Sequence, residues 1–120
     1  MNTSNSRQSY SLYPHKTDAQ IQAEFADLVV RACKGDRRAV GAIYVAFGPV
    51  LLREARSVMG GFKQDAEDVV QDFFVSLLEG RSVYVPAHGY ATRWMCGVVR
   101  AMAKTYRKER KREWGIGHEP

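Results

Sequence analysis

The segment DAEDVVQDFFVSLLE at positions 65–79 constrains the fold of this chain more than any other. Its apolar residues recur at steps of three and four, so an α-helix would place them on one continuous face: Ala66, Val69, Val70, Phe73, Phe74, Leu77 and Leu78. Asp65 is expected to cap this helix at its start, and Gly80 to end it. Such a helix is stable in water only when other parts of the chain cover its apolar face.

Three further stretches show the same helical periodicity. The first begins around Thr17, with Thr17 or Asp18 as its N-cap, and ends at Gly35. The second follows Asp36 and is closed by the two glycines at positions 60 and 61. The last begins near Tyr90 and carries apolar residues on one side and basic residues on the other. Because no strand pair is needed anywhere, the pattern predicts an all-α protein.

A glycine–proline pair interrupts the second of these helices. Pro49 lacks a backbone N–H and crowds the preceding turn, so we expect a kink or short break near Phe47, after which the apolar stripe resumes in phase. A chain of 120 residues holds one domain. We therefore predict a compact four-helix bundle over residues 17–113, with a flexible N-terminal arm over 1–16 and a tail or the start of a linker over 114–120.

The charged residues are unevenly distributed along the chain. The formal net charge is +5, and residues 100–113 alone contain seven lysines or arginines against two glutamates. Residues 65–79 contain five acidic residues and no basic one. One acidic and one basic element favour two partners of opposite charge, with nucleic acid as the partner of the basic element. The alternative is that both are ordinary solvated helix faces.

The outer side of the 65–79 helix carries polar residues at helical spacing. Two aspartates, a glutamine, a valine, a serine and a glutamate lie opposite the apolar face: Asp68, Gln71, Asp72, Val75, Ser76 and Glu79. Carboxylates accept bidentate hydrogen bonds from arginine, and a glutamine amide bonds backbone or side-chain groups. We interpret this side as a docking surface for a basic partner helix, with a solvated face as the alternative.

The last helix combines basic residues with aromatic residues near its start. Its outer side carries six lysines and arginines: Arg93, Arg100, Lys104, Arg107, Lys108 and Lys111. Lysine and arginine neutralise phosphates, and exposed rings stack on unpaired bases, a combination typical of single-strand binding. We expect the rings of Tyr84 and Tyr90 to be exposed for this purpose. Trp94 has two interpretations, because it is also in phase with the apolar residues of the helix.

The sequence gives little support for an enzyme or a cofactor site. It has no nucleophile elbow, phosphate-binding glycine loop or zinc-protease motif. The adjacent Glu67 and Asp68 would point in different directions on a helix, and His88 reads as an exposed loop histidine without a partner. Cys33 and Cys96 have no metal-ligand spacing and are expected to be reduced and partly buried. We expect no metal and no cofactor. We also find neither a secretory signal nor a membrane-spanning run, and expect a cytoplasmic protein.

Several segments together resemble region 2 of the bacterial sigma-70 family, especially its extracytoplasmic-function (ECF) group. The resemblance covers about residues 28–112 and rests on KGDRRAVGAIYVAFGPVLLREAR, then DAEDVVQDFFVSLLE, a short loop, and WMCGVVRAMAKTYRKERKR, in family order. It implies a helical bundle of the sigma region 2 type. It also implies a transcription initiation factor whose partners are core RNA polymerase, promoter DNA including the non-template single strand and, as a further candidate, an anti-sigma factor.

The resemblance also implies residue roles. The 65–79 helix would dock on the clamp coiled coil of core polymerase through Asp68, Gln71 and Asp72, a surface that Val75 and Glu79 extend. The last helix would bind and melt the minus-ten promoter element, with Trp94 in the family's tryptophan position and Arg100 in its usual basic position. The loop over residues 81–89, which starts at Arg81, would capture a flipped promoter base.

The chain departs from the family pattern at three positions of the last helix. Ala101 stands where family members commonly carry asparagine, Thr105 where they carry aspartate, and Ala91 where they carry an aromatic, with Tyr90 displaced by one. ECF factors continue into a second helical domain, so the chain is interpreted as an excised domain or a naturally short protein. Two alternative functions stay open: a polymerase- or anti-sigma-binding module without promoter melting, and a nonspecific basic nucleic-acid-binding domain.

Overall fold

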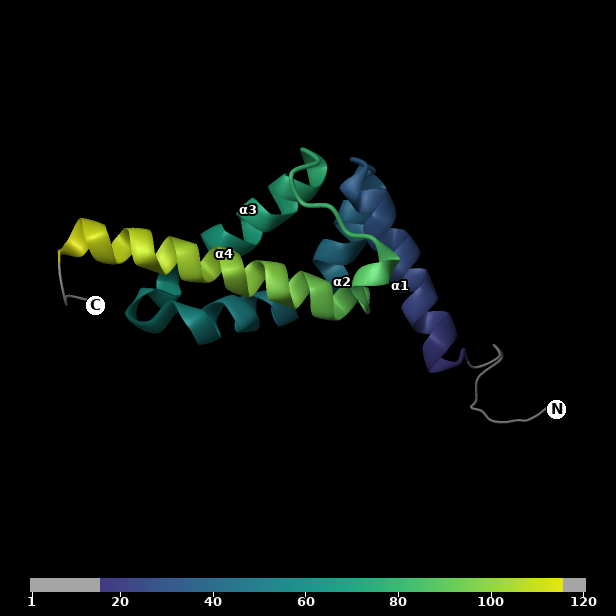
Figure 1. Cartoon of the computed structure of the whole chain (residues 1–120), viewed down its shortest axis with the longest axis horizontal. Coiled ribbons are helices and arrows are strands. Elements are labelled where there is room, and N and C mark those ends of the chain that lie inside the picture. Colours follow the sequence, from purple (N-terminus) through teal and green to yellow (C-terminus); the bar gives the residue numbers. More distant parts are fainter. Residues whose placement is uncertain (1–15, 116–120) are drawn as a thin grey trace.

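The structure, a computed structural model, describes residues 16–115, and within that range it is built from helices (Figure 1). The elements in chain order are α1 (Asp18–Cys33), α2 (Arg37–Met59), the 3-10 helix η1 (Gly60–Asp65), α3 (Ala66–Leu78), the 3-10 helix η2 (Pro86–His88) and α4 (Ala91–Trp114). The described residues contain no strand, which confirms the all-α prediction. Apart from residue 16, the predicted arm lies outside the described residues, as do residues 116–120 of the predicted tail.

The first two helices begin at the predicted positions. Thr17 is the N-cap of α1: its hydroxyl oxygen accepts from the N–H of Gln20 at 3.1 Å, and the Gln20 side chain accepts from the N–H of Thr17 at 2.8 Å. The Asp36 carboxylate accepts from the N–H groups of Arg38 and Ala39 at the start of α2. Between the two helices, Gly35 has a φ of +87°, a conformation that favours glycine.

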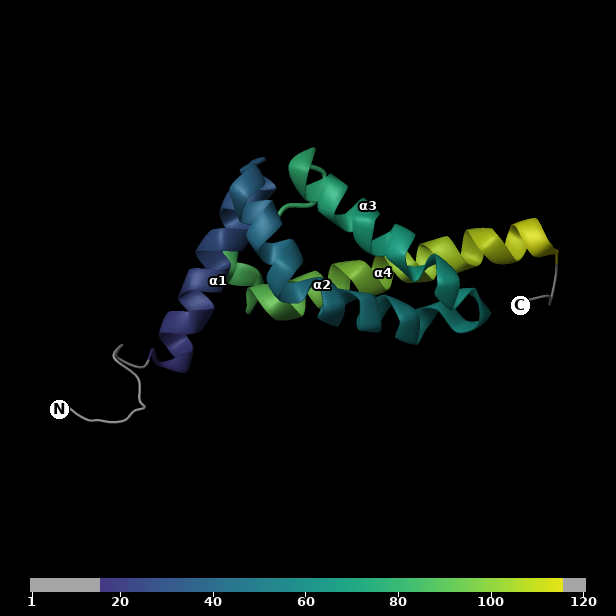
Figure 2. The ribbon, with the colours of Figure 1, turned by 180° about the vertical axis from the view of Figure 1, so that it is seen from behind.

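Helix α2 bends within its length but is not broken (Figure 2), and Pro49 lies inside it, in agreement with the predicted kink. The half before the bend lies beside α1, and the half after it runs along α4. The apolar stripe resumes in phase, because Ile43 before the bend and Leu51 after it are both fully buried. A single helix thus contributes to the packing of α1, α3 and α4.

The core lies where α2, α3 and α4 meet. Its largest fully buried side chains include Phe73 and Leu77 of α3, Met59 of α2 and Met95 of α4. One residue of the predicted apolar face departs from it: Leu78, the last residue of α3, is 40% exposed. Leu78 lies at the end of α3, and the cap residue Glu79 that follows it is exposed as well.

The predicted capping role of Asp65 is wrong. Asp65 precedes α3 but makes no side-chain capping bond, because it is the last residue of η1, which runs directly into α3. Its carboxylate instead faces α4, where Asp65 Oδ2 lies 3.0 Å from Arg110 Nε. The Arg110 guanidinium also lies over the ring of Phe62, at 5.6 Å from its centroid. This group of contacts fastens the C-terminal half of α4 to η1.

Across residues 16–115, no helix combines the length and the apolarity that crossing a membrane requires.

Candidate functional site

The outer side of α3 presents an acidic surface, which we call the acidic ridge. It consists of Asp68, Gln71, Asp72, Val75 and Glu79, all of which are exposed. These residues lie opposite the fully buried Val69, Phe73 and Leu77 of the same helix. The structure therefore brings the predicted docking residues together on one side of one helix.

Ser76 was also expected on this surface, and that prediction is wrong. Ser76 is 2% exposed, and its hydroxyl donates to the carbonyl of Phe73 at 2.6 Å and lies 2.7 Å from the Ser82 hydroxyl. The chain after α3 turns back over Ser76, whose own carbonyl accepts from the N–H groups of Arg81 and Ser82. Ser76 thus fixes the start of the following loop and is not available to a partner.

Arg81, predicted to contact DNA, lies against the acidic ridge. Its guanidinium approaches Glu79 at 2.7 Å (Nε to Oε1) and Asp72 at 3.6 Å (Nη2 to Oδ1). The hydrogen bond to Glu79 raises the pKa of the Arg81 guanidinium further above its usual value. Arg81 therefore joins the first residue of the 81–89 loop to the C-terminal end of the ridge.

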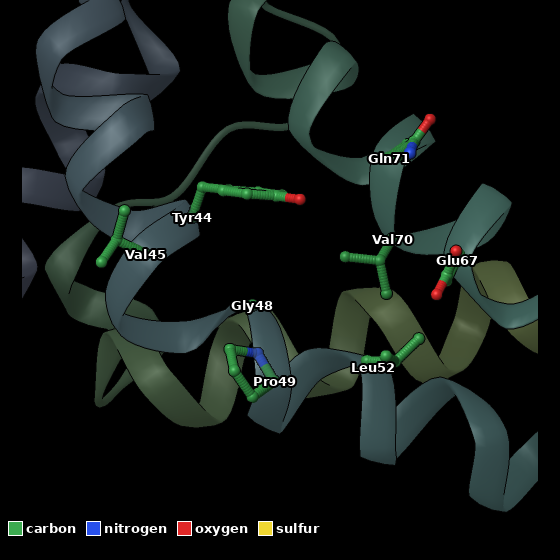
Figure 3. A pocket seen from close by; sticks show the side chains of 8 residues that line it. All are labelled: Tyr44, Val45, Gly48, Pro49, Leu52, Glu67, Val70 and Gln71. Carbon is green, nitrogen blue, oxygen red and sulfur yellow. The ribbon is translucent and has the colours of Figure 1, made fainter.

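An apolar groove adjoins the N-terminal part of the acidic ridge (Figure 3). It has a volume of about 430 Å³ and is lined by residues from the bend of α2 and from α3: Tyr44, Val45, Gly48, Pro49, Leu52, Glu67, Val70 and Gln71. Gln71 belongs to both the ridge and the groove. Tyr44 and Val45 are 53% and 80% exposed. Sequence reasoning missed the groove, and its one available signal was the glycine–proline pair.

The basic face of α4 is formed by Arg93, Arg100, Lys104, Arg107, Lys108 and Lys111. All of these side chains are exposed except Arg107, which is half-buried. Arg100 reaches α2, where its Nη1 lies 3.4 Å from Glu54 Oε1 and 3.3 Å from the Ser57 hydroxyl. Among the described residues, Lys104, Lys108 and Lys111 have no ion-pair partner within the chain, so their charges are available to an outside anion.

The aromatic residues at the start of α4 divide into exposed and buried rings. Tyr90 is 59% exposed, as predicted. Tyr84 is only 2% exposed, so the prediction that its ring is exposed for stacking is wrong. The Tyr84 ring packs against Trp94, with centroids 5.2 Å apart, and Trp94 is half-buried and also lies 6.3 Å from the ring of Phe73. Trp94 therefore combines a packing role with a partly exposed surface.

The two cysteines are free and half-buried, as predicted. Burial raises the pKa of both thiols, and in Cys33 a hydrogen bond from the Tyr84 N–H to the sulfur partly offsets this effect. Burial also raises the pKa of the Tyr106 hydroxyl, with Asp65 and Asp68 adding to the shift. Within residues 16–115, no group of three or more histidine, cysteine, aspartate or glutamate side chains is arranged to hold a metal ion.

Comparison with known families defines the class to which this helical fold belongs. A family model described as Sigma-70 region 2 matches residues 43–113, which is more than half of the chain. The chain therefore belongs to the sigma-70 family through its region 2. Neither the curated proteins nor the solved structures yielded a match to the chain.

The general function of the chain follows from its membership of this family. Region 2 is a domain of a transcription initiation factor and not an enzyme, and it interacts with core RNA polymerase and promoter DNA. The matched residues begin in the first half of α2 and stop one residue before the end of α4, so they include the acidic ridge, the 81–89 loop and the basic face. The alternative of a nucleic-acid binder unrelated to transcription is thereby set aside.

Proposed function

We propose that this chain is region 2 of an ECF-group sigma factor acting in the cytoplasm. Its acidic ridge docks on the clamp coiled coil of core RNA polymerase. The basic face of α4, together with Tyr90 and the exposed part of Trp94, binds the non-template strand of the minus-ten element and assists promoter melting. An anti-sigma factor that competes for the acidic ridge is a further candidate partner.

The observation that carries the docking half is the continuity of the acidic ridge with the apolar groove. A partner helix with basic residues along one side and an apolar residue at its edge would find complementary groups on both. Its arginines would bond to Asp68 and Asp72. An apolar side chain would enter the groove beside Tyr44 and Val70, which point toward the same space in Figure 3.

The DNA half rests on the separation of charges between helices. Three lysines of α4 are exposed without partners among the described residues, and Tyr90 offers an exposed ring next to the first turn of the same helix. Lysines would contact phosphates, and the ring would stack on an unpaired base. This arrangement favours a single strand that runs along α4 toward the 81–89 loop.

One observation favours an alternative in which the chain docks on polymerase without melting DNA. Ala101 is exposed and offers no hydrogen-bonding side chain, and the Thr105 hydroxyl one turn later donates to the carbonyl of Ala101 at 3.2 Å. The asparagine that family members commonly carry is thus replaced by alanine, and the aspartate by a threonine whose hydroxyl already makes a hydrogen bond within the helix. Permanganate footprinting of a promoter in the reconstituted complex separates the two functions, because only melting exposes reactive thymines.

The docking half is tested by replacing Asp68 and Gln71 with alanine. Both side chains are exposed, so stability should change by no more than about 0.5 kcal/mol while association with core polymerase weakens. The double variant Asp27→Ala/Gln64→Ala, which removes the same two residue types at exposed positions off the ridge, is the matched control and should bind normally. Equal binding by the ridge variant and this control would reject the acidic ridge as the docking surface.

A further inference from the structure

The loop that leads into α4 is held closed by Tyr84. The Tyr84 hydroxyl donates to the carbonyl of Gly89 at 2.6 Å, which joins the two ends of a six-residue segment. Its backbone N–H donates to the sulfur of Cys33 at 3.4 Å, and its ring lies against Trp94. One buried residue therefore connects the end of α1 through its backbone, and the end of the loop and the first turn of α4 through its side chain.

The backbone of the segment is arranged around this closure. The N–H of His88 donates to the carbonyl of Val85 at 2.9 Å, and the N–H of Gly89 donates to that of Pro86 at 3.1 Å, which forms η2. Gly89 has a φ of +98° and a ψ of −159°, a conformation that is accessible essentially only to glycine. This conformation places the Gly89 carbonyl within reach of the Tyr84 hydroxyl, so the turn and the hydrogen bond depend on each other.

Large apolar or aromatic side chains in and directly beside the same segment are exposed. The exposed fraction of Val83, Val85 and Tyr90 is at least two-fifths in each case. These side chains are held in place without any packing above them, so their positions depend on the backbone beneath. The partly buried hydrogen bond of the Tyr84 hydroxyl is the contact best placed to fix that backbone, because its loss leaves the hydroxyl of a buried side chain without its partner.

We propose that Tyr84 is a positioning residue for single-strand binding: it does not touch the nucleic acid but holds the 84–89 segment closed, and so fixes Tyr90 and Trp94 in the arrangement that binds an unpaired base. This inference rests on the proposed function, in which Tyr90 and Trp94 form part of the DNA surface. It reassigns Tyr84 from a contact residue to a residue that acts through others.

The direct test is Tyr84→Phe, which removes the hydroxyl and keeps the ring against Trp94. We expect the variant to bind a fluorescently labelled single-stranded oligonucleotide of mixed sequence about 3- to 10-fold more weakly. The reason is that, without this hydrogen bond, a smaller fraction of the molecules has the closed loop that binds the strand. The dependence of affinity on salt should not change, since no cation is lost. Tyr106→Phe removes the same atom from a tyrosine of α4 outside the loop and should bind like wild type.

A second variant approaches the closure from its other end. Gly89→Ala meets open space at its added Cβ but strains the backbone, so it should open the same turn and weaken binding by a similar factor. If both variants act through one closure, the double variant should lose about as much affinity as the single variant with the larger loss. Independent effects would instead multiply the two fold-losses. Amide hydrogen exchange at His88 and Gly89, measured without DNA, should accelerate in each variant.

The outcomes separate this inference from the function on which it rests. Weaker binding by Tyr84→Phe with an unchanged salt dependence, less-than-additive coupling to Gly89→Ala and faster loop exchange supports it. Tyr84→Phe binding as tightly as wild type, while Tyr90→Ala binds more weakly, overturns the positioning role and leaves the proposed DNA surface intact. Wild-type binding by both Tyr84→Phe and Tyr90→Ala overturns the DNA role of this loop, and the inference with it.

Discussion

At the scale of single residues, Phe73 shows how one side chain connects the two candidate surfaces. It is fully buried under the acidic ridge, and its ring contacts those of Phe74 and Trp94 at centroid distances of 5.2 and 6.3 Å. The helix that carries the ridge and the tryptophan at the start of α4 are therefore joined by one aromatic contact. Loss of the Phe73 ring should therefore disturb the packing of both α3 and the start of α4.

We expect Phe73→Ala to lower the free energy of unfolding by about 3 to 5 kcal/mol, through lost burial and the cavity that remains. This is a large share of the stability of a small domain. Thermal and urea denaturation followed by circular dichroism measure the effect. Val75→Ala, on the exposed side of α3, is the control and should change stability by less than about 0.5 kcal/mol. A melting temperature of Phe73→Ala equal to wild type would show that the helical register is wrong.

The residues that sequence reasoning misplaced share a physical reason. Ser76 and Tyr84 are polar residues beside a predicted helix end and in a predicted loop, where exposure is the usual outcome. Both are buried because their hydroxyls find partners, the Ser82 hydroxyl and the Gly89 carbonyl, that only the folded loop supplies. Tyr90, which has no such partner among the described residues, is exposed as predicted. The periodicity of apolar and polar residues does not show which hydroxyl will find a hydrogen-bond partner inside the folded protein.

At the scale of elements, α4 is a basic helix in which some cations are already engaged. Arg100 contacts Glu54 and Ser57 of α2, and Arg110 contacts Asp65 of η1 and Glu113 of its own helix. Arg110 lies away from the basic face, so its charge serves the packing of α4 on η1. The lysines at positions 104, 108 and 111 are the cations best placed to neutralise phosphates.

With some three to five phosphate contacts, log affinity for nucleic acid should fall with log salt at a slope of roughly −2 to −4. Lys104→Ala combined with Lys108→Ala should reduce the size of that slope by about 1.5, because each neutralised phosphate contributes about 0.7 to 0.9. A fluorescence titration over a series of salt concentrations measures both values. Tyr90→Ala is the comparison: it should weaken binding and keep the slope, since stacking releases no counterions. A wild-type slope near zero would contradict phosphate contacts by α4.

The elements themselves were largely predictable, and their arrangement was not. Local signals determined the helix starts at Thr17 and Asp36 and the bend at Pro49, because caps and proline act within one turn of the chain. The 3-10 helix η1 and the groove beside Tyr44 were missed. Both arise from how α2 returns toward α3, which depends on contacts between residues far apart in sequence. The exposed side of α3 was predicted correctly except for Ser76, because a helix wheel describes well which residues share one side of a helix, whereas the docking role of that side stays a prediction.

At the scale of the whole molecule, α2 is the element that unites the fold. Its bend lets the first half pair with α1 and the second half with α4, while α3 packs against both the bend and α4 (Figure 2). The acidic ridge and the basic face consequently lie on different helices that share a single core. Each surface has a helix of its own, and the two helices meet where Asp72 of the ridge and Ala101 and Thr105 of α4 line one shallow pocket.

Arg81 also makes the acidic ridge electrically uneven along its length. Asp72 and Glu79 share the charge of Arg81, whereas Glu67 and Asp68, at the other end of α3, have no basic partner among the described residues. The potential thus becomes more negative toward the end that adjoins the apolar groove, and this gradient should orient an incoming basic helix before any contact forms. In an NMR titration with a short arginine-rich peptide at low salt, the first changes in backbone amide chemical shift should occur near Glu67 and Asp68. Simultaneous shifts along all of α3 would show that the gradient gives the approaching helix no preferred direction.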